Sequence, residues 1–278
     1  MKKILILMLC AVMTFSLCAC GGGSNSGGGG EQQKAVFRVG MECDYAPFNW
    51  TQTNETERSV PITSGGYADG YDVQIAKLIA EGLGMELEIV KIEWDGLTLA
   101  LQSGEIDAII AGMSPTEERK LTIDFTDPYY ESELVIVVRK DGPYVNAQSL
   151  ADFAGAKITG QLNTFHYTVI DQIPGVEKEV ALETFPAMIV ALTSGKIDGY
   201  ISERPGAVSA QEANPDLTFV EFSEGNGFVA SPEDVAVAVG LVKGSDLTEK
   251  INAILAGIDN ETRQTMMDEA VANQPLGN

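Results

Sequence analysis

The chain has few of the residues on which many enzymes and metal proteins depend. Its 278 residues include one histidine, four cysteines and two tryptophans, and 18 basic residues stand against 40 acidic ones. The resulting net charge of −22 argues against nucleic acid as a partner, because nucleic-acid-binding proteins need basic surface. The same charge argues against non-specific binding to anionic lipid.

Motifs of catalysis and cofactor binding are also missing. No Gly-x-Ser-x-Gly nucleophile elbow and no phosphate-binding loop occurs, and no Gly-x-Gly-x-x-Gly follows a predicted strand. His166, the only histidine, is predicted to be a surface or helix-cap residue, and Cys43 a small packing residue. We therefore expect a protein that is not an enzyme and that holds no cofactor and no metal.

The N-terminus has the pattern of an export signal. Lys2 and Lys3 precede an apolar run, residues 4–17, that is too short to span a bilayer comfortably. The following Leu17-Cys18-Ala19-Cys20 resembles the lipobox of bacterial lipoproteins. The resemblance implies that residues 1–19 are removed and that Cys20 carries a lipid anchor. An ordinary signal peptide with incidental cysteines is the alternative.

A tether is predicted to follow the anchor. Residues 21–30 are nearly all Gly and Ser, which is typical of a flexible spacer, and we assign residues 20–35 to it. Cys43 is then the one cysteine of the folded part, so no internal disulfide is expected. These features predict a lipid-anchored protein on the outer face of a bacterial cytoplasmic membrane.

An eleven-residue phrase that occurs twice predicts the architecture. Residues 100–110 and 191–201 share seven identical positions and lie 91 residues apart. Each copy indicates a helix end, a Ser-Gly stop and a short apolar strand. A spacing of about 90 residues is too long for a solenoid repeat and fits two lobes of similar construction.

Alternating strand and helix patterns predict an α/β fold with a mostly parallel sheet in each lobe. We expect a helix over residues 71–83, a polar loop over 49–70 and a strand over 235–239. Two chain crossings between the lobes predict a hinge, and hinged lobes can close around a ligand. The lobe boundaries are 36–132 and 235–278 for the first lobe and 133–234 for the second.

Polar residues that follow the two repeat copies are candidates for ligand binding, because ligands bind beyond the carboxyl ends of strands in α/β sheets. Ser114-Pro115-Thr116-Glu117 is predicted to be a capping box, and Arg119 lies in the next turn. Together they could capture a carboxylate, although a plain cap with a surface arginine fits the spacing equally well. Glu203 follows the second copy and could face an ammonium group.

Aromatic and acidic side chains near strand ends extend this prediction. Tyr45 and Trp94 could stack on a ligand, whereas Phe48 and Trp50 fit core packing better. Strand alternation places Glu42 and Asp44 on one face. Together with Glu203 they would form an acidic pocket suited to a cationic side chain.

The order of these segments resembles the polar amino-acid-binding proteins of bacterial ABC importers, extracellular solute-binding family 3. The resemblance runs from about residue 36 to about residue 258. The segments that carry it are Arg38-Val-Gly-Met-Glu-Cys-Asp-Tyr-Ala-Pro-Phe48, Gly70-Tyr-Asp-Val-Gln-Ile-Ala76, Trp94-Asp-Gly-Leu97, Ile109-Ile-Ala-Gly-Met-Ser-Pro-Thr-Glu-Glu-Arg119, Asp124-Phe-Thr-Asp-Pro-Tyr-Tyr130 and Leu134-Val-Ile-Val-Val-Arg-Lys140.

The resemblance implies a type II periplasmic-binding-protein-like fold with a two-stranded hinge, and it implies roles for single residues. Arg119, with Ser114 and Thr164, would bind the ligand's α-carboxylate. The Gly112 carbonyl and Glu203 would receive the α-ammonium, and Glu203 stands where the family usually has the shorter Asp. The remaining implied contacts, with the ligand side chain, come from Tyr45, Trp94 and Glu42.

Three departures from the family leave parts of this assignment open. The longer acid at position 203 changes the geometry, the 49–70 loop is longer than usual, and Leu162-Asn163-Thr164 replaces the common Gly-Thr-Thr.

The sequence thus predicts a monomeric receptor that delivers a free amino acid to an ABC permease in the membrane. Arginine or lysine is the favoured ligand, and glutamine or another neutral polar amino acid is the alternative. A dehydratase of cyclic acids on the same fold is a less favoured hypothesis. A sensory domain would need a transmembrane segment after the fold, and we expect none here.

Overall fold

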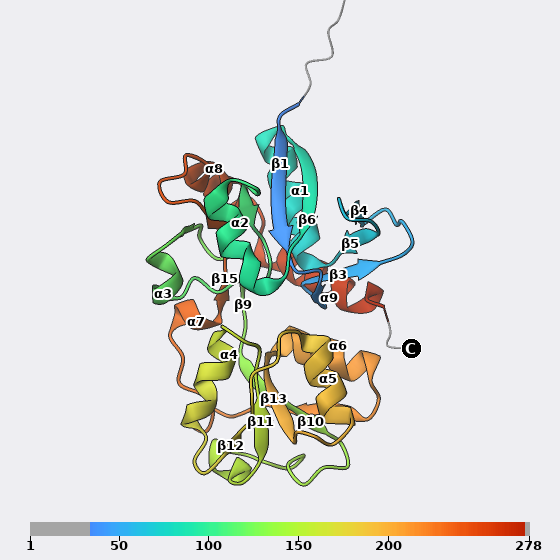
Figure 1. The fold of residues 1–278 in the computed structure, drawn as a ribbon, viewed down its shortest axis with the longest axis vertical. Helices are drawn as coiled ribbons and strands as arrows, with labels where there is room; N and C mark the ends of the chain where they lie inside the picture. Colours follow the sequence, from blue (N-terminus) through green and yellow to red (C-terminus); the bar gives the residue numbers. More distant parts are fainter. Residues whose placement is uncertain (1–33, 276–278) are drawn as a thin grey trace, which may run out of the picture. The chain divides into compact units, whose positions relative to one another are not determined.

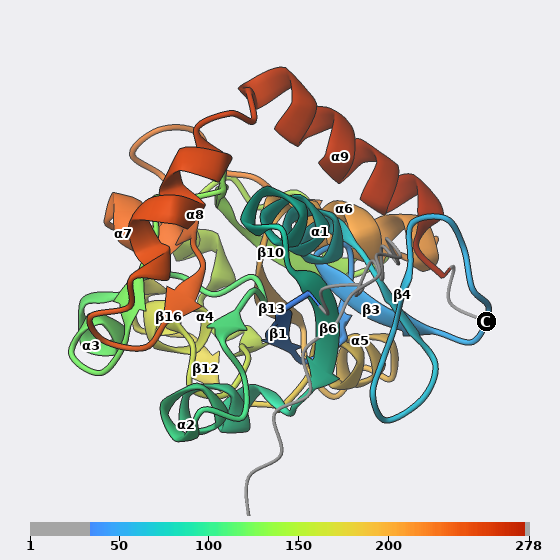
Figure 2. The same cartoon turned by 90° about the horizontal axis from the view of Figure 1, so that it is seen from above.

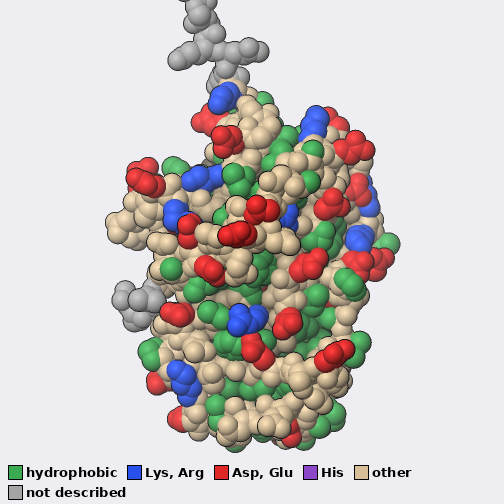
Figure 3. All heavy atoms as spheres, turned by 180° about the vertical axis from the view of Figure 1, so that it is seen from behind, with side chains coloured by type: hydrophobic (Ala, Val, Ile, Leu, Met, Phe, Trp, Pro, Cys, Tyr) green, Lys and Arg blue, Asp and Glu red, His purple; other side chains and the backbone are tan. Residues whose placement is uncertain are grey.

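The computed structural model describes residues 34–275, which contain two five-stranded sheets (Figure 1). The predicted signal segment 1–19 and most of the tether, including Cys20, lie outside the described residues. No helix within 34–275 has both the length and the apolar character needed to cross a bilayer. Acidic side chains are scattered over the face shown in Figure 3.

The first sheet mixes parallel and antiparallel pairs. Its strands, in spatial order, are β6 (Glu86–Lys91), β1 (Val36–Met41), β7 (Ala108–Ile109), β16 (Gly240–Leu241) and β8 (Asp124–Phe125). β1 is parallel to β6 and β7, whereas β16 is antiparallel to β7 and β8. β6, β1, β7 and β8 therefore run in one direction in this sheet, and β16 runs in the opposite direction between β7 and β8.

The second sheet repeats this arrangement. Its strands, in spatial order, are β12 (Glu177–Lys178), β11 (Lys157–Thr159), β13 (Gly199–Glu203), β10 (Leu134–Arg139) and β14 (Leu217–Val220). β11 is parallel to β12 and β13, and β10 is antiparallel to β13 and β14. Each sheet is thus mostly parallel, as the sequence predicted, because four of its five strands run in one direction. The exceptions are β16 and β10, and each is antiparallel to both of its neighbours.

The repeated phrase occupies equivalent places in the two lobes. In each copy the end of a helix, α2 (Leu97–Ser103) or α5 (Phe185–Thr193), precedes a glycine with positive φ. Gly104 has φ 77° and Gly195 has φ 72°, which is the left-handed conformation that ends many helices. The strand that follows, β7 or β13, is the middle strand of its sheet. The prediction of two lobes of similar construction is therefore confirmed.

Two antiparallel strands link the lobes. β9 (Tyr130–Glu131) leads into the second lobe, and β15 (Ala236–Val237) leads back, with Ala236 opposite Glu131. Of the strand predicted over 235–239, only Ala236–Val237 are in a strand, β15, because Val235 ends a short helix and the next strand, β16, begins at Gly240. This pair is the predicted two-stranded hinge.

Helices cover the sheets and bring the lobes into contact. α1 (Tyr71–Leu83) has the predicted bounds and buries Val73, Ile75 and Ile79, as its amphipathic pattern requires. α9 (Asn260–Asn273) packs against both α1 and α6 (Arg204–Ala213), which belong to different lobes (Figure 2). The other helices are α3 (Glu117–Lys120), α4 (Phe165–Thr168), α7 (Pro232–Val235), α8 (Leu247–Leu255) and 3₁₀ helices at Trp94–Gly96, Leu150–Phe153 and Val169–Gln172.

Two local predictions are wrong. The predicted loop over 49–70 contains three strands that form a small antiparallel sheet with β2 (Asp44–Tyr45), namely β3 (Asn49–Gln52), β4 (Val60–Pro61) and β5 (Tyr67–Asp69). The segment is polar and lacks the apolar alternation that predicts strands, so the sequence analysis assigned it to a loop. Backbone pairing holds these strands together. The helix expected to start at Ser114 is only α3, and its N-cap is Thr116, whose hydroxyl accepts a hydrogen bond from the Arg119 N–H.

Candidate functional site

The predicted ligand-binding residues meet at the carboxyl ends of β7 and β13. Seven of the eight line one cavity, which is also bounded by Gln161, Phe165 and His166. These seven are Tyr45, Trp94, Gly112, Ser114, Arg119, Thr164 and Glu203. The two lobes both contribute to the cavity, as the positions of the repeat copies led us to expect.

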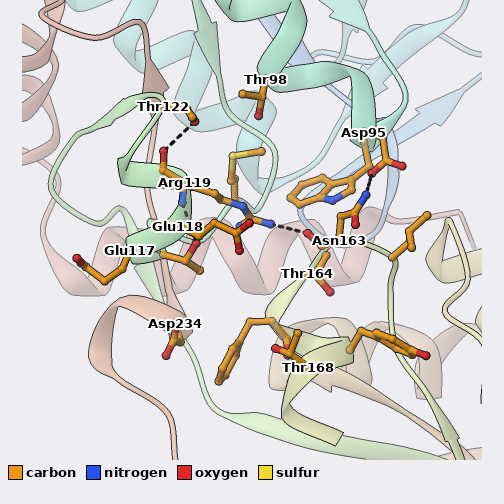
Figure 4. Close-up of a pocket in the computed structure, with 16 residues that line it drawn as sticks. Asp95, Thr98, Glu117, Glu118, Arg119, Thr122, Asn163, Thr164, Thr168 and Asp234 are labelled. Carbon is orange, nitrogen blue, oxygen red and sulfur yellow. Dashed lines mark hydrogen bonds between the residues drawn. The ribbon is translucent and has the colours of Figure 1, made fainter. Parts of the chain in front are cut away.

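The cavity is small and leads to a wider cleft. Its volume is about 10 Å³, which is roughly the space of one water molecule. The adjoining cleft has a volume of about 730 Å³ and shares Trp94, Arg119 and Thr164 with the cavity (Figure 4). An amino acid would therefore need the lobes to separate before it could enter the inner cavity.

Arg119 lies at the boundary between the cleft and the cavity. Its guanidinium donates to the Ser114 carbonyl at 2.9 Å. A second bond, to the Asn163 carbonyl at 3.1 Å, is drawn in Figure 4. It also lies over the Trp94 ring, with Cζ 5.1 Å from the ring centroid. Burial lowers the pKa of Arg119 to about 10, so the side chain keeps its charge at neutral pH. This planar cation can bind a carboxylate through two hydrogen bonds.

Glu203 supplies a negative charge to the cavity from the second lobe. It ends β13, is only 3% exposed, and accepts hydrogen bonds from the Tyr45 hydroxyl and from His166 Nε2 at 2.9 Å. Burial acts to raise the pKa of Glu203, but His166 and the bond from Tyr45 outweigh it and lower the pKa. The carboxylate is therefore ionised at neutral pH and can face an ammonium group.

The prediction for His166 is wrong. The side chain is 8% exposed, pairs with Glu203 and meets the edge of the Phe185 ring. α4 is a single turn at the cavity wall, and its second residue points inward instead of toward solvent. The available signal was the spacing, since His166 follows Thr164, a predicted binding residue, by two positions.

Glu42 is buried beside the cavity, not in its lining. Its Oε2 accepts a hydrogen bond from Gln161 Nε2 at 3.1 Å, which joins the two lobes, and its Oε1 has no hydrogen-bond partner. Burial, followed by the charge of Asp44, raises the pKa of Glu42 to about 8. Gln161 itself was missed by the sequence analysis.

Asp44 does not join the predicted acidic pocket. Its carboxylate pairs with Lys91 at 3.2 Å and is partly exposed. Strand alternation stops at Cys43, which has a φ of 55°, so Glu42 and Asp44 no longer share a face.

Tyr45 lines the cavity and belongs to the first lobe. It is 2% exposed and stacks on Phe185 of the second lobe, with ring centroids 4.0 Å apart. Phe48 and Trp50 are buried in the core, as predicted. Tyr45 therefore contacts the second lobe through both its ring and its hydroxyl.

A buried aspartate supports the turn at Gly112. Asp72 accepts hydrogen bonds from the Tyr129 hydroxyl and from Asn49 Nδ2, both at 2.7 Å, and from the Gly112 N–H. Gly112 has a φ of 63°, and a Cβ there would lie 2.9 Å from the Tyr45 ring. Burial raises the pKa of Asp72 to about 6. Its signal in the sequence was a charged residue on the apolar face of α1.

No metal site accompanies these groups. Across residues 34–275, no set of three or more His, Cys, Asp and Glu side chains is arranged to hold a metal ion. The charged groups that line the cavity include Arg119 from the first lobe and Glu203 from the second.

The sequence profile of the bacterial extracellular solute-binding proteins, family 3, matches residues 37–270. This chain belongs to that family. It is 32% identical over 270 residues to the arginine-binding extracellular protein ArtP of Bacillus subtilis, a match that covers 94% of each chain.

Solved structures of similar proteins share the fold. An amino-acid ABC transporter substrate-binding protein, AbpA, from Streptococcus pneumoniae bound to L-arginine is 27% identical, with a TM-score of 0.72. The match covers 86% of this chain and 95% of that one. The ancestral amino-acid-binding protein AncCDT-1, a precursor of cyclohexadienyl dehydratase, is 27% identical, with a TM-score of 0.69, over 85% of this chain and 96% of that one. The predicted two-lobed fold is confirmed.

Proposed function

We propose that this family 3 protein is the substrate-binding receptor of an amino-acid ABC importer and that its ligand is a cationic amino acid, arginine or lysine. The observation that carries the proposal is that one cavity is lined by both a positive charge, Arg119 of the first lobe, and a negative charge, Glu203 of the second. This arrangement complements an α-carboxylate and an α-ammonium group. Similarity to proteins named for arginine binding supports the choice of ligand.

The proposal gives each end of the ligand its own partners in the cavity. Arg119 would bind the α-carboxylate, with help from Ser114 and Thr164. Glu203 and the Gly112 carbonyl would receive the α-ammonium. Tyr45 and Trp94 would then flank the ligand's stem. An amino acid so placed replaces hydrogen bonds that the lobes now make to each other, as between Tyr45 and Glu203.

Glu42 supports a cationic side chain on the ligand. Its Oε1 is buried without a partner and burial raises its pKa to about 8, so a nearby ligand cation would stabilise the ionised form that burial disfavours. The alternative ligand is glutamine, because a protonated Glu42 beside Gln161 could also bind an amide.

Calorimetric titration of the purified protein with L-arginine, L-lysine and L-glutamine tests the proposal. We expect Arg119→Ala to weaken every ligand that binds at least tenfold, since each has the same α-carboxylate. Glu42→Gln should weaken arginine and lysine more than glutamine. Tight binding of glutamine with no heat from arginine or lysine would overturn the cationic assignment. An unchanged dissociation constant in Arg119→Ala would remove Arg119 from the site.

Membrane attachment and delivery to a permease are parts of the same proposal. They are supported by the lipobox-like end at Cys20, the Gly/Ser-rich segment and membership of an extracellular binding-protein family. Cys20→Ser should move the protein from the membrane fraction to the medium or periplasm. Retention of the variant in membranes would contradict the anchor.

A binding role without turnover is also proposed. The similarity to AncCDT-1, a precursor of a dehydratase, makes the dehydratase hypothesis worth a direct test. Incubation with a cyclic acid substrate and detection of its dehydrated product by NMR would reveal such an enzyme. We expect no product, because the charged groups of the cavity are arranged as anchors for the two ends of an amino acid.

A further inference from the structure

Asn163 connects the two lobes at the mouth of the cavity. Its side-chain Nδ2 donates to Asp95 Oδ1 at 2.9 Å, and its backbone carbonyl accepts from Arg119 Nη2 at 3.1 Å (Figure 4). Asp95 and Arg119 both belong to the first lobe, whereas Asn163 belongs to the loop between β11 and α4 of the second. One residue therefore makes two separate hydrogen bonds across the cleft.

One of these bonds is to Arg119, and the other is to Asp95, the residue next to Trp94; Arg119 and Trp94 stack on each other. Asp95 directly follows Trp94 in its 3₁₀ helix, and Arg119 lies over the Trp94 ring. When the lobes meet, the Asn163 side chain holds the segment that carries Trp94, and its carbonyl holds the guanidinium. Closure of the second lobe thus fixes the group that we propose to bind the ligand carboxylate.

The backbone at Asn163 restricts which residues can do this. Its φ is 55°, in the left-handed region, which glycine adopts freely and asparagine tolerates better than most residues. Glycine would keep the carbonyl in place but would remove the amide donor. Asparagine satisfies the backbone and also supplies the bond to Asp95.

We propose that Asn163 is a positioning residue that latches the closed lobes and so slows the release of the bound amino acid. The proposal rests on the proposed function and deepens it, because it assigns ligand residence time to a contact outside the ligand. The latch bonds exist only when the lobes touch, so their loss should raise the dissociation rate and leave the association rate nearly unchanged. A single hydrogen bond of this kind corresponds to a factor of about 2 to 10.

Stopped-flow tryptophan fluorescence with L-arginine tests the latch in a cycle of four proteins, which are the wild type, Asn163→Asp, Asp95→Asn and the double variant, and in two further variants. Asn163→Gly removes the amide, and Asn163→Asp places a second carboxylate against Asp95. Asp95→Asn completes the cycle with Asn163→Asp, because in the double variant the donor and acceptor exchange places. Asn54→Asp is the charge control, because this substitution adds the same charge at an exposed position away from the cleft.

We expect arginine to dissociate about 3- to 10-fold faster from Asn163→Gly and faster still from Asn163→Asp. The double variant should return to within about twofold of the wild type, and Asn54→Asp should not change the rate. Failure of the exchanged pair to restore slow release would overturn the proposal. Equal changes in the association and dissociation rates would overturn it as well.

Hydrogen exchange without ligand separates this proposal from the proposed function. Peptides that cover residues 94–98 and 161–168 should exchange faster in Asn163→Asp than in the wild type and should regain protection in the double variant. If arginine does not bind but this pattern appears, the ligand assignment fails and the latch stands. If exchange is the same in all variants, the latch fails whatever the ligand.

Discussion

At the residue scale, Glu203 shows how one carboxylate serves several partners. Its pKa is lowered although the side chain is buried, because His166 and Tyr45 stabilise the ionised form. The longer acid, unusual at this position by the resemblance, reaches His166 and Tyr45 at once. A ligand ammonium would add a cationic partner to the same carboxylate.

Glu203→Gln should weaken binding of L-arginine by roughly 10- to 100-fold, since hydrogen bonds to charged groups contribute about 1.5–3 kcal/mol. His166→Gln is the matched control, because glutamine can still donate a hydrogen bond to Glu203 while the carboxylate remains. Calorimetric titration measures both variants. A larger loss in His166→Gln than in Glu203→Gln would contradict the role of Glu203 as the ammonium partner.

Glu42 predicts a pH dependence of stability. Its pKa in the folded protein is about 8, above the ordinary value of 4.5, so the folded state holds a proton that the unfolded state has lost. The stability that this proton provides is complete below about pH 4.5 and is lost as the pH rises through 8. We expect the free energy of unfolding without ligand to fall by on the order of 1–2 kcal/mol between pH 6.5 and pH 9.

Urea denaturation at these two pH values measures the effect, and Glu42→Gln should remove most of it. Asp72 has the same sign, but its pKa of about 6 confines most of its contribution to lower pH. An equal decrease in the wild type and in Glu42→Gln would show that Glu42 does not titrate in this window.

At the element scale, the start of α1 depends on a close approach between backbones. The N–H groups of Tyr71 and Asp72 donate to the carbonyls of Pro47 and Phe48, and Gly70 has a φ of 131°. A Cβ at Gly70 would lie 2.3 Å from the Phe48 carbonyl oxygen. This contact holds α1, with Asp72, against the segment that carries Tyr45.

Gly70→Ala should therefore destabilise the protein far more than Gly84→Ala, which changes the glycine at the other end of α1. Gly84 also has a positive φ, but a Cβ there meets no atom within 4 Å. We expect Gly84→Ala to lower the free energy of unfolding by about 1 kcal/mol, because of its backbone conformation alone. Gly70→Ala should lower it by at least about 2 kcal/mol more. Urea denaturation compares them, and equal losses would mean that the backbone contact is unimportant.

At the scale of the whole molecule, ligand binding depends on two lobes that meet through few polar contacts. The cavity of about 10 Å³ is closed by contacts between lobes, which include the Tyr45–Glu203 and Gln161–Glu42 bonds. Two hinge strands and the packing of α9 on both lobes connect them. Opening thus separates a small set of named bonds and leaves each sheet intact.

L-arginine at 100 times its dissociation constant should stabilise the folded protein by about 2.7 kcal/mol. For a protein of this size the melting temperature should rise by roughly 5–10 °C, which a thermal-shift measurement detects. Agmatine, which lacks the α-carboxylate, should give a much smaller shift because Arg119 gains no partner. Equal shifts with both compounds would contradict the proposed orientation of the ligand.

The sequence by itself determined the two-lobed α/β architecture and the approximate place of the site. The repeated helix, glycine and strand are local patterns, so they predict β7 and β13 without knowledge of distant contacts. Arg119 lies in α3, the first helix after β7, and Glu203 is the last residue of β13. Strand ends are where ligands bind in such sheets. The polar 49–70 segment shows the limit of this reasoning, since its strands form through backbone pairing that composition does not reveal.

Only the tertiary structure decided which side chains meet across the cleft. His166, Gln161 and Asn163 contact groups of the cavity and of the first lobe that lie far away in the chain, and no local pattern encodes those distances. The φ of Cys43 likewise turns Asp44 away from Glu42, which alternation alone could not show. Local propensity specifies the elements, whereas the packing of two separately built lobes specifies the contacts between them.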